Sequence, residues 1–216
     1  MATTTSSSTA KRSGDAKPSA PGAAVKTKAK AAAVAKASAL APDLTVRLGS
    51  TPKESFRGSP DIFGRLVEDH DLHRALLAMI EETEPRAPER ARLFTELVRE
   101  LKSHAAAEEQ ALWSTVLRVP ETTEFARHAI AEHKEIDGML ADLAARDYTA
   151  AGWLKRFAAL KEKYLHHIRE EEQEQFVAAE KVLTPADEKY MRGVFKRRKK
   201  AEKAAAKIEK KIKLKG

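Results

Sequence analysis

Large apolar side chains recur every three or four residues through four stretches of the chain, and this spacing predicts amphipathic helices. The stretches are residues 60–82, 88–117, 121–145 and 150–182. Ser59 and Pro60 suit the N-cap and the first position of the first helix. Because the connections are short, neighbouring helices must run antiparallel. The sequence therefore predicts an all-α fold, an up-down-up-down four-helix bundle.

The N-terminal segment has a different character. Residues 1–55 are rich in Ala, Lys, Ser and Pro and poor in large apolar side chains, so we expect a disordered basic arm. Within it, residues 24–39 favour a helix, which would be marginal unless an acidic partner supported it. The predicted organisation is an arm over residues 1–55, a bundle over residues 56–183 and a basic helical tail over residues 184–216.

The C-terminal tail should begin as a fifth helix. Thr184 and Asp187 have the spacing of a capping box around its first turn. Three side chains of its early part could pack on the bundle: Tyr190, Met191 and Val194. Beyond Phe195 the segment is too rich in charge to bury, so we expect it to project into solvent.

The formal net charge of the 216 residues is +8, and it is unevenly distributed. Residues 1–55 carry nine basic and three acidic side chains, residues 188–216 carry thirteen and three, and the segment between them has a net charge of −8. Lysine-rich ends often serve only solubility. Such segregation also suits nonspecific contact with the phosphates of nucleic acid or with another polyanion.

Composition excludes several classes of protein. The chain has no Cys, which rules out disulfide scaffolds, zinc fingers and thiol nucleophiles and leaves His and carboxylates as metal ligands. No apolar run approaches the ~20 residues of a membrane span, and residues 1–30 lack the apolar core of a secretory signal. We therefore expect a cytoplasmic protein. An organellar transit peptide, or a nuclear signal at KRRKK, is the minority alternative.

Histidine and glutamate positions repeat with an offset of 63 residues. The offset relates His70 to His133, His104 to His167, Glu108 to Glu171 and Trp113 to Phe176. In each half, the second His and the Glu are four residues apart and share one helix face. The two aromatic residues are expected to pack at one end of the bundle.

An antiparallel bundle could bring these side chains to one level as a cage of four imidazoles and two carboxylates. That donor set suits a pair of iron or manganese ions bridged by carboxylates, with a position left open for a small ligand. Burying the same groups without a metal would be costly. The repeat therefore predicts a two-metal centre.

Four strings, LVEDHDLHRALL, ELKSHAAAEEQALW, AEHKEIDGML and YLHHIREEEQEQF, resemble the hemerythrin-like or HHE cation-binding domains over residues 61–182. The resemblance implies a four-helix bundle that holds a non-haem di-iron centre. The implied ligands are His70, His104, Glu108, His133, His167 and Glu171. It also implies that the centre binds or senses oxygen, nitric oxide, peroxide or iron itself.

The chain departs from the family pattern at one position. Oxygen-carrying hemerythrins have a further His where this chain has Asp137, so six ligands are expected instead of seven. Family members also use a carboxylate five residues after the last His, which makes Glu172 the alternative to Glu171. His166 and Glu170 have the same spacing as the predicted fourth-helix pair, but the 63-residue repeat selects the latter.

Other polar residues near the predicted centre are expected to have plainer roles. His73 lies one turn from a candidate ligand and could support it, whereas His128 should face outward. Glu109, Glu170 and Glu172 are expected to be solvated charges.

Three functions compete. The first is a di-iron protein that binds or senses a small ligand, with basic tails for an anionic partner. The second is a nucleoid-type DNA-associated protein with the bundle as a scaffold, and the third is a peroxide-consuming di-iron enzyme. No acid/base pair stands apart from the predicted ligands, which favours binding over catalysis.

Overall fold

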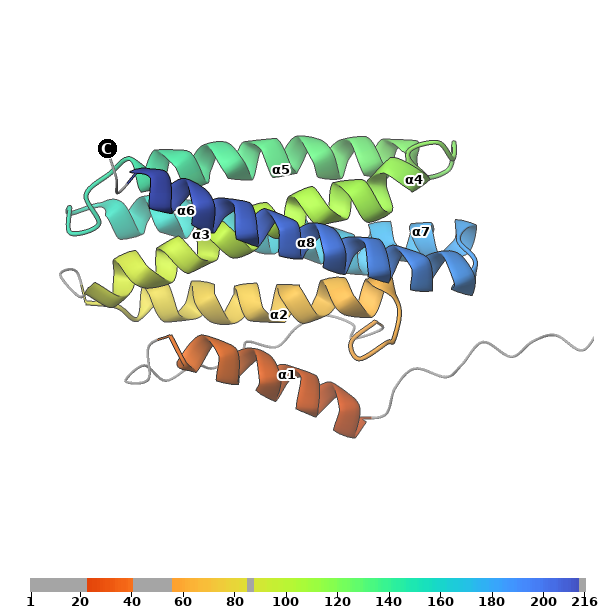
Figure 1. Cartoon of the computed structure of the whole chain (residues 1–216), viewed down its shortest axis with the longest axis horizontal. Helices are drawn as coiled ribbons and strands as arrows, with labels where there is room; N and C mark the ends of the chain where they lie inside the picture. Colours follow the sequence, from red (N-terminus) through yellow and green to blue (C-terminus); the bar gives the residue numbers. More distant parts are fainter. Residues whose placement is uncertain (1–22, 41–55, 85–87, 214–216) are drawn as a thin grey trace, which may run out of the picture.

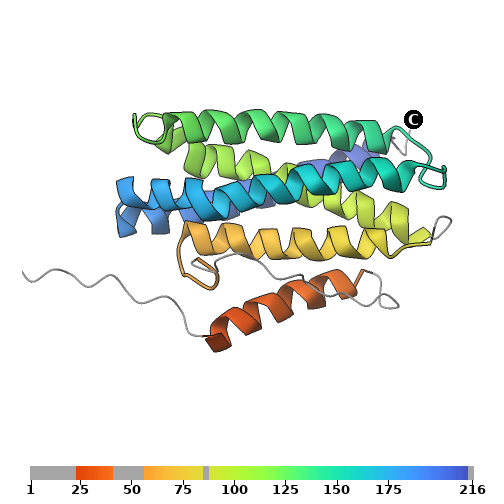
Figure 2. The same ribbon diagram turned by 180° about the vertical axis from the view of Figure 1, so that it is seen from behind.

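The computed structural model describes residues 23–40, 56–84 and 88–213, and all regular secondary structure in these ranges is helical. Four long rods lie side by side (Figures 1 and 2). The rods are α2 (Ile62–Glu81), α3 (Pro88–Glu108) continued by α4 (Ser114–Val116), α5 (Thr123–Ala144), and α6 (Trp153–Glu170) continued by α7 (Phe176–Val182). The predicted all-α class is confirmed. No helix in the described ranges is both long and apolar enough to cross a bilayer.

Two of the rods contain a wider, π-helical turn at matching positions. The turns are η1 (Glu109–Trp113), between α3 and α4, and η2 (Glu171–Gln175), between α6 and α7. In each, the backbone N–H of the next residue, Ser114 or Phe176, donates to the carbonyl five positions earlier. Such single turns cluster at functional sites. The apolar spacing predicted uninterrupted helices because one extra residue barely disturbs it.

The start of α2 differs from the prediction. Asp61, not Ser59, is the N-cap, and its carboxylate accepts a hydrogen bond from the backbone N–H of Gly64 at 2.9 Å. The Ser59 hydroxyl donates to the same carboxylate. Gly64 is required here because a Cβ would lie 2.0 Å from the Ser59 carbonyl oxygen. The expectation that Ser59 caps a helix opening at Pro60 is therefore wrong.

Two apolar layers fill the bundle, one toward each end. The first apolar layer includes Leu76, Leu97, Leu140 and Phe157. The second apolar layer includes Phe63, Leu112, Trp113 and Phe176. The Trp113 and Phe176 rings have centroids 6.2 Å apart and are nearly parallel, which confirms the predicted packing at the bundle end. In each rod the candidate His lies close to the boundary between the two layers, so apolar side chains shield it on both sides.

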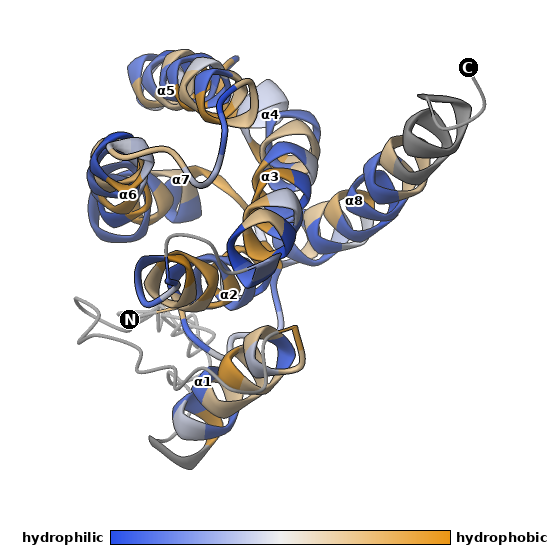
Figure 3. Cartoon of the chain, turned by 90° about the vertical axis from the view of Figure 1, so that its left-hand side faces the viewer, coloured by the Kyte–Doolittle hydropathy of each residue, from blue (hydrophilic) through white to orange (hydrophobic). Residues whose placement is uncertain are grey.

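Helix α1 (Ala23–Ser38) packs along α2 (Figures 1 and 3). Its small side chains allow a close approach, and Ala33 and Ala37 are buried. The expectation of a disordered arm is therefore wrong for this stretch. Residues 1–22 and 41–55 of the predicted arm lie outside the described residues.

Helix α8 (Pro185–Lys213) lies along α3 and also contacts α2 (Figure 1). The predicted capping box is confirmed. The backbone N–H of Thr184 donates to the Asp187 carboxylate at 3.0 Å, and the N–H of Asp187 donates to the Thr184 hydroxyl at 3.2 Å.

The side chains of α8 correct two expectations. Met191 is buried, but Tyr190 is 70% exposed and does not pack on the bundle. Lys199, which was expected in solvent, is only 4% exposed. Its neighbours Lys196 and Lys200 are exposed, so α8 presents one face to the bundle and one to water.

Candidate metal centre

Four imidazoles, one from each rod, converge between the two apolar layers. His70 on α2 and His104 on α3 form one pair, with ring centroids 5.0 Å apart and Nε2 atoms 3.3 Å apart. His133 on α5 and His167 on α6 form a second pair, with centroids 4.9 Å apart. All four side chains are buried. The structure thus brings together the four histidines that the repeat singled out.

Glu108, at the end of α3, lies between the two imidazole pairs. One of its carboxylate oxygens is 3.5 Å from Nε2 of His104 and 3.5 Å from Nε2 of His133. These two imidazoles belong to different pairs. The carboxylate is therefore placed to join them.

Glu171, the residue at the matching position after α6, has the same arrangement. Its two oxygens lie 3.4 Å from Nε2 of His70 and 3.4 Å from Nε2 of His167. His133, His167 and Glu171 form a group whose donor atoms all lie within 4.8 Å of one another. Both carboxylates therefore touch both pairs, as bridging ligands of two ions would.

The spacing of the donor atoms suits coordination of metal ions better than hydrogen bonding between the side chains. All four carboxylate oxygens of Glu108 and Glu171, and Nε2 of His133, are buried without a hydrogen-bond partner. Buried polar atoms rarely lack partners, since desolvation is then uncompensated. Donors about 2.1 Å from a shared ion, at angles of roughly 90–110°, lie about 3.0–3.4 Å apart. The observed spacings of 3.3 to 3.5 Å agree with that geometry.

A second set of carboxylates holds the four imidazoles from behind. Nδ1 of each ring is hydrogen-bonded: His70 to Glu172 at 2.8 Å, His104 to Asp69 at 3.1 Å, His133 to Glu109 at 2.9 Å and His167 to Glu132 at 2.9 Å. A carboxylate at Nδ1 keeps the proton there and leaves Nε2 free as the donor atom. All four Nε2 atoms consequently face the centre.

Sequence reasoning missed this supporting set. Glu172 is buried, so the expectation that it is a solvated charge is wrong. The Glu109 side chain is 40% exposed, as expected, but it also bonds His133. The signal was present, because the 63-residue offset also relates Asp69 to Glu132 and Glu109 to Glu172. The repeat therefore extends from the candidate ligands to the groups that orient them.

A family model described as the hemerythrin HHE cation-binding domain matches residues 61–179, more than half of the chain. The chain belongs to the hemerythrin HHE cation-binding family. The predicted resemblance is thus confirmed, and the family implies that the bundle binds a cation, typically iron. Searches of curated proteins and of solved structures returned no significant match. Helices α1 and α8 lie outside the matched residues.

Protonation divides the HHE site unevenly. Burial disfavours the charged form of His133, but the nearby carboxylates of Glu108 and Glu109 outweigh it and raise its pKa to about 9. Burial lowers the pKa of His167 to about 4. Burial, together with the charge of Glu108, raises the pKa of Glu171 well above its usual range. Glu108 and Glu171 repel each other when both are ionised, and bound cations would offset this repulsion.

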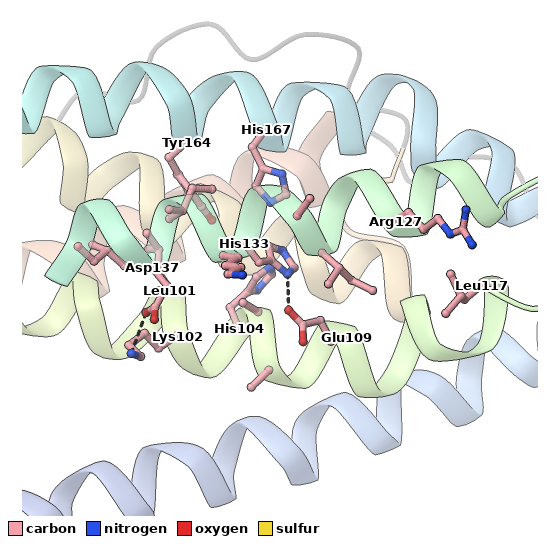
Figure 4. Close-up of a pocket in the computed structure, with 17 residues that line it drawn as sticks. Leu101, Lys102, His104, Glu109, Leu117, Arg127, His133, Asp137, Tyr164 and His167 are labelled. Atoms are coloured by element: carbon pink, nitrogen blue, oxygen red, sulfur yellow. Dashed lines mark hydrogen bonds and ion pairs between the residues drawn. The ribbon is translucent and has the colours of Figure 1, made fainter. Parts of the chain in front are cut away.

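Four residues considered for the HHE site lie apart from it. Asp137 has a half-exposed side chain that pairs with Lys102 at 2.7 Å, so it does not reach the imidazoles (Figure 4). His166 and Glu170, the alternative fourth-helix pair, lie near the surface and bond each other at 3.2 Å. His128 faces outward as predicted and lies 3.1 Å from Glu170.

A second group with metal-ligating side chains occurs on the surface of the HHE domain, formed by His128, Glu132 and Glu170. Its Glu132 is already bonded to His167 and to Lys163, both at 2.9 Å. Glu132 therefore belongs to the support of the buried site, whereas His128 and Glu170 do not contact its imidazoles.

His73 and Tyr164 line the same buried region. Nδ1 of His73 lies 2.5 Å from the Tyr164 hydroxyl, and the His73 ring packs edge-on against His104 with centroids 5.1 Å apart. These contacts place His73 beside the candidate ligand His104, and its support of His70 stays a prediction. Burial raises the pKa of Tyr164 well above its usual value, so its hydroxyl keeps its proton.

A groove of about 600 Å³ between α3 and α5 leads from the surface to the HHE site (Figure 4). Ala105 and Ala106 on α3 and Ala131 on α5 line it, and these small side chains leave the space between the helices unfilled. Three imidazoles line its inner part: His104, His133 and His167. A ligand can therefore reach the candidate metal site from this side.

Proposed function

We propose that this HHE domain holds two iron ions, one at each imidazole pair, within an up-down-up-down bundle. The proposed ligands are His70, His104, Glu108, His133, His167 and Glu171, with both carboxylates shared between the ions. One observation carries the proposal: the carboxylate oxygens of Glu108 and Glu171 are buried without a hydrogen-bond partner, yet each carboxylate lies against imidazoles of both pairs. Family membership supports iron, and manganese suits the same donors.

We propose further that the centre binds or senses a small ligand such as oxygen, nitric oxide or peroxide. Two imidazoles and two carboxylates would hold each ion, and Asp137 lies too far out to join them. An ion held by these residues would have coordination positions left for a small ligand. When bound, iron supplies a redox-active Lewis acid at those positions. The protein holds the imidazoles through Nδ1, excludes water with its two apolar layers and admits the ligand through the α3–α5 groove.

Metal analysis of protein expressed with excess iron tests the ligand set. We expect about two ions per chain in the wild type and close to none after His104→Ala with His167→Ala. The matched control is His128→Ala with His166→Ala, because both of these side chains are exposed. Less than one ion per wild-type chain, or equal iron in the two double variants, would refute the centre.

The route to the centre is tested by filling the groove. Ala131→Trp should slow the spectral change on adding nitric oxide to the reduced protein at least tenfold, without loss of iron. Ala159→Trp, at an exposed position on α6, is the control. Equal binding rates in the two variants would show that the ligand enters elsewhere.

A further inference from the structure

A second groove, of about 420 Å³, lies where α8 packs across α2 and α3, away from the α3–α5 groove. Its lining is almost entirely cationic: Arg65, Arg99, Lys196, Lys199, Lys200 and Lys203. Arg65 comes from α2, Arg99 from α3 and the lysines from α8 (Figures 1 and 3). The packing of three helices has therefore gathered cations that are far apart in the sequence.

The acids facing this groove do not balance its cations. They are Glu68, Asp69, Glu96 and Glu100, which pair with Arg65, Arg99, Lys199 and Lys203. Lys196 and Lys200 are exposed and have no acidic partner within ion-pair distance among the described residues. They stand one helical turn apart at the mouth of the groove. An anion bound there would meet two uncompensated charges, Lys196 and Lys200, in front of four cations that are held in ion pairs.

The chemistry of the surface favours nucleic acid over a membrane. An interfacial helix needs apolar side chains beside its cations to enter the lipid. In this described part of α8, Met191 and Phe195 are buried against the bundle and Val194 is half-buried, so Tyr190 is the one large exposed apolar side chain and cannot by itself form an apolar face. The phosphodiester groups of nucleic acid are regularly spaced anions that bind to cations alone, without apolar contacts. The groove therefore suits a nucleic acid backbone.

The same groove is joined to the candidate metal centre. Lys199 contacts the same Asp69 oxygen that is hydrogen-bonded to Nδ1 of His104, and the Lys199 ammonium lies 2.9 Å from Glu100. Arg65 holds the other Asp69 oxygen at 2.7 Å. A phosphate that pairs with Arg65 or Lys199 would weaken the contact of that cation with Asp69 and so change the hydrogen bond between Asp69 and His104.

We propose that the α2–α3–α8 groove binds the phosphodiester backbone of double-stranded nucleic acid and that its occupancy is transmitted through Asp69 to His104. The binding half of this proposal stands without the metal. The significance of the coupling for ligand binding rests on the proposed di-iron centre. Because linkage is reciprocal, the state of His104 would in turn alter the affinity for nucleic acid.

Fluorescence anisotropy of a labelled 25-base-pair duplex with the full chain tests the binding site. Lys196→Glu with Lys200→Glu should weaken binding at least tenfold and reduce the slope of log K against log salt by about 1.8, at 0.9 per lost phosphate contact. Lys155→Glu with Lys181→Glu makes the same charge change at exposed lysines of α6 and α7 and should cost less than about threefold, since only long-range attraction is lost. Equal losses in the two variants would overturn the site. So would binding to phosphatidylserine vesicles without binding to the duplex.

Ring ¹⁵N NMR of the histidines, recorded on the full chain without added metal, tests the coupling. A saturating duplex should shift the Nδ1 resonance of His104, assigned with His104→Gln, and leave that of His133 in place. An unmoved His104 resonance at saturation would overturn the coupling. Because neither measurement uses iron, failure of the di-iron proposal remains distinguishable from failure of this one.

Discussion

Glu171 and Glu172 are adjacent acids in the same wide turn, and the structure assigns them opposite roles. Glu171 faces both imidazole pairs and its oxygens have no hydrogen-bond partner. Glu172 bonds His70 at 2.8 Å and accepts two hydrogen bonds from Arg74 at 2.9 Å. Replacing each by Leu, in separate variants, should therefore change the stability of chelator-treated protein in opposite directions.

The magnitudes follow from these partners. A buried polar group without partners costs about 1–3 kcal/mol, so Glu171→Leu should stabilise the chelator-treated protein by that amount. Glu172→Leu removes hydrogen bonds between charged groups worth about 1.5–3 kcal/mol and should destabilise it. At roughly 2–4 °C per kcal/mol, Tm should rise by about 2–12 °C in the first variant and fall by about 3–12 °C in the second.

Metal binding should rank the two variants differently. Loss of a group that orients a ligand costs about 10–100-fold in metal affinity, which is the expectation for Glu172→Leu. Glu171→Leu would remove a donor from both proposed ions and should cost more than about 100-fold. Thermal unfolding with chelator, and competition titration with iron, measure the two effects. If both variants shift Tm in the same direction, or if Glu172→Leu loses more iron, the assigned roles are reversed or absent.

Three further changes have definite expected outcomes. Gly64→Ala should lower the free energy of unfolding, measured in urea, by about 1–3 kcal/mol because the new Cβ would clash with the Ser59 carbonyl. Gly138→Ala, on an open helix face, should raise it by about 0.5–1 kcal/mol. Equal effects of the two substitutions would exclude the clash at Gly64. Tyr164→Phe should cost about 1–3 kcal/mol by leaving Nδ1 of His73 unpaired, and no change in Tm would show that water replaces the hydroxyl. Lowering the pH from 7 to 5 should release iron, because protons compete for imidazole nitrogens, and full retention after gel filtration would contradict imidazole ligation.

Apolar spacing was sufficient to predict the four rods, because each buries one continuous stripe. The 63-residue repeat was sufficient to predict which side chains converge, because equivalent positions in two antiparallel helix pairs lie at one level. Periodicity within one helix could not predict the burial of Glu172, since an ideal helix turns it about 100° away from Glu171. The wide turn and two partners from α2 hold it inside. Lys199 was read as solvated for a similar reason, because its partners come from other helices.

The repeat also explains why α8 packs where it does. In one half of the centre, Glu132 supports His167 and is neutralised by Lys163 at 2.9 Å. The 63-residue offset places Glu100 where Lys163 would stand in the other half, so Asp69 behind His104 faces a second buried acid instead of a lysine. Arg65 of α2 pairs with Asp69 at 2.7 Å, but the second acid, Glu100, needs a cation from elsewhere. Lys199 of α8 supplies it by contacting both acids. A helix outside the family match thus completes the charge balance of one half of a two-fold site, which makes it part of the centre.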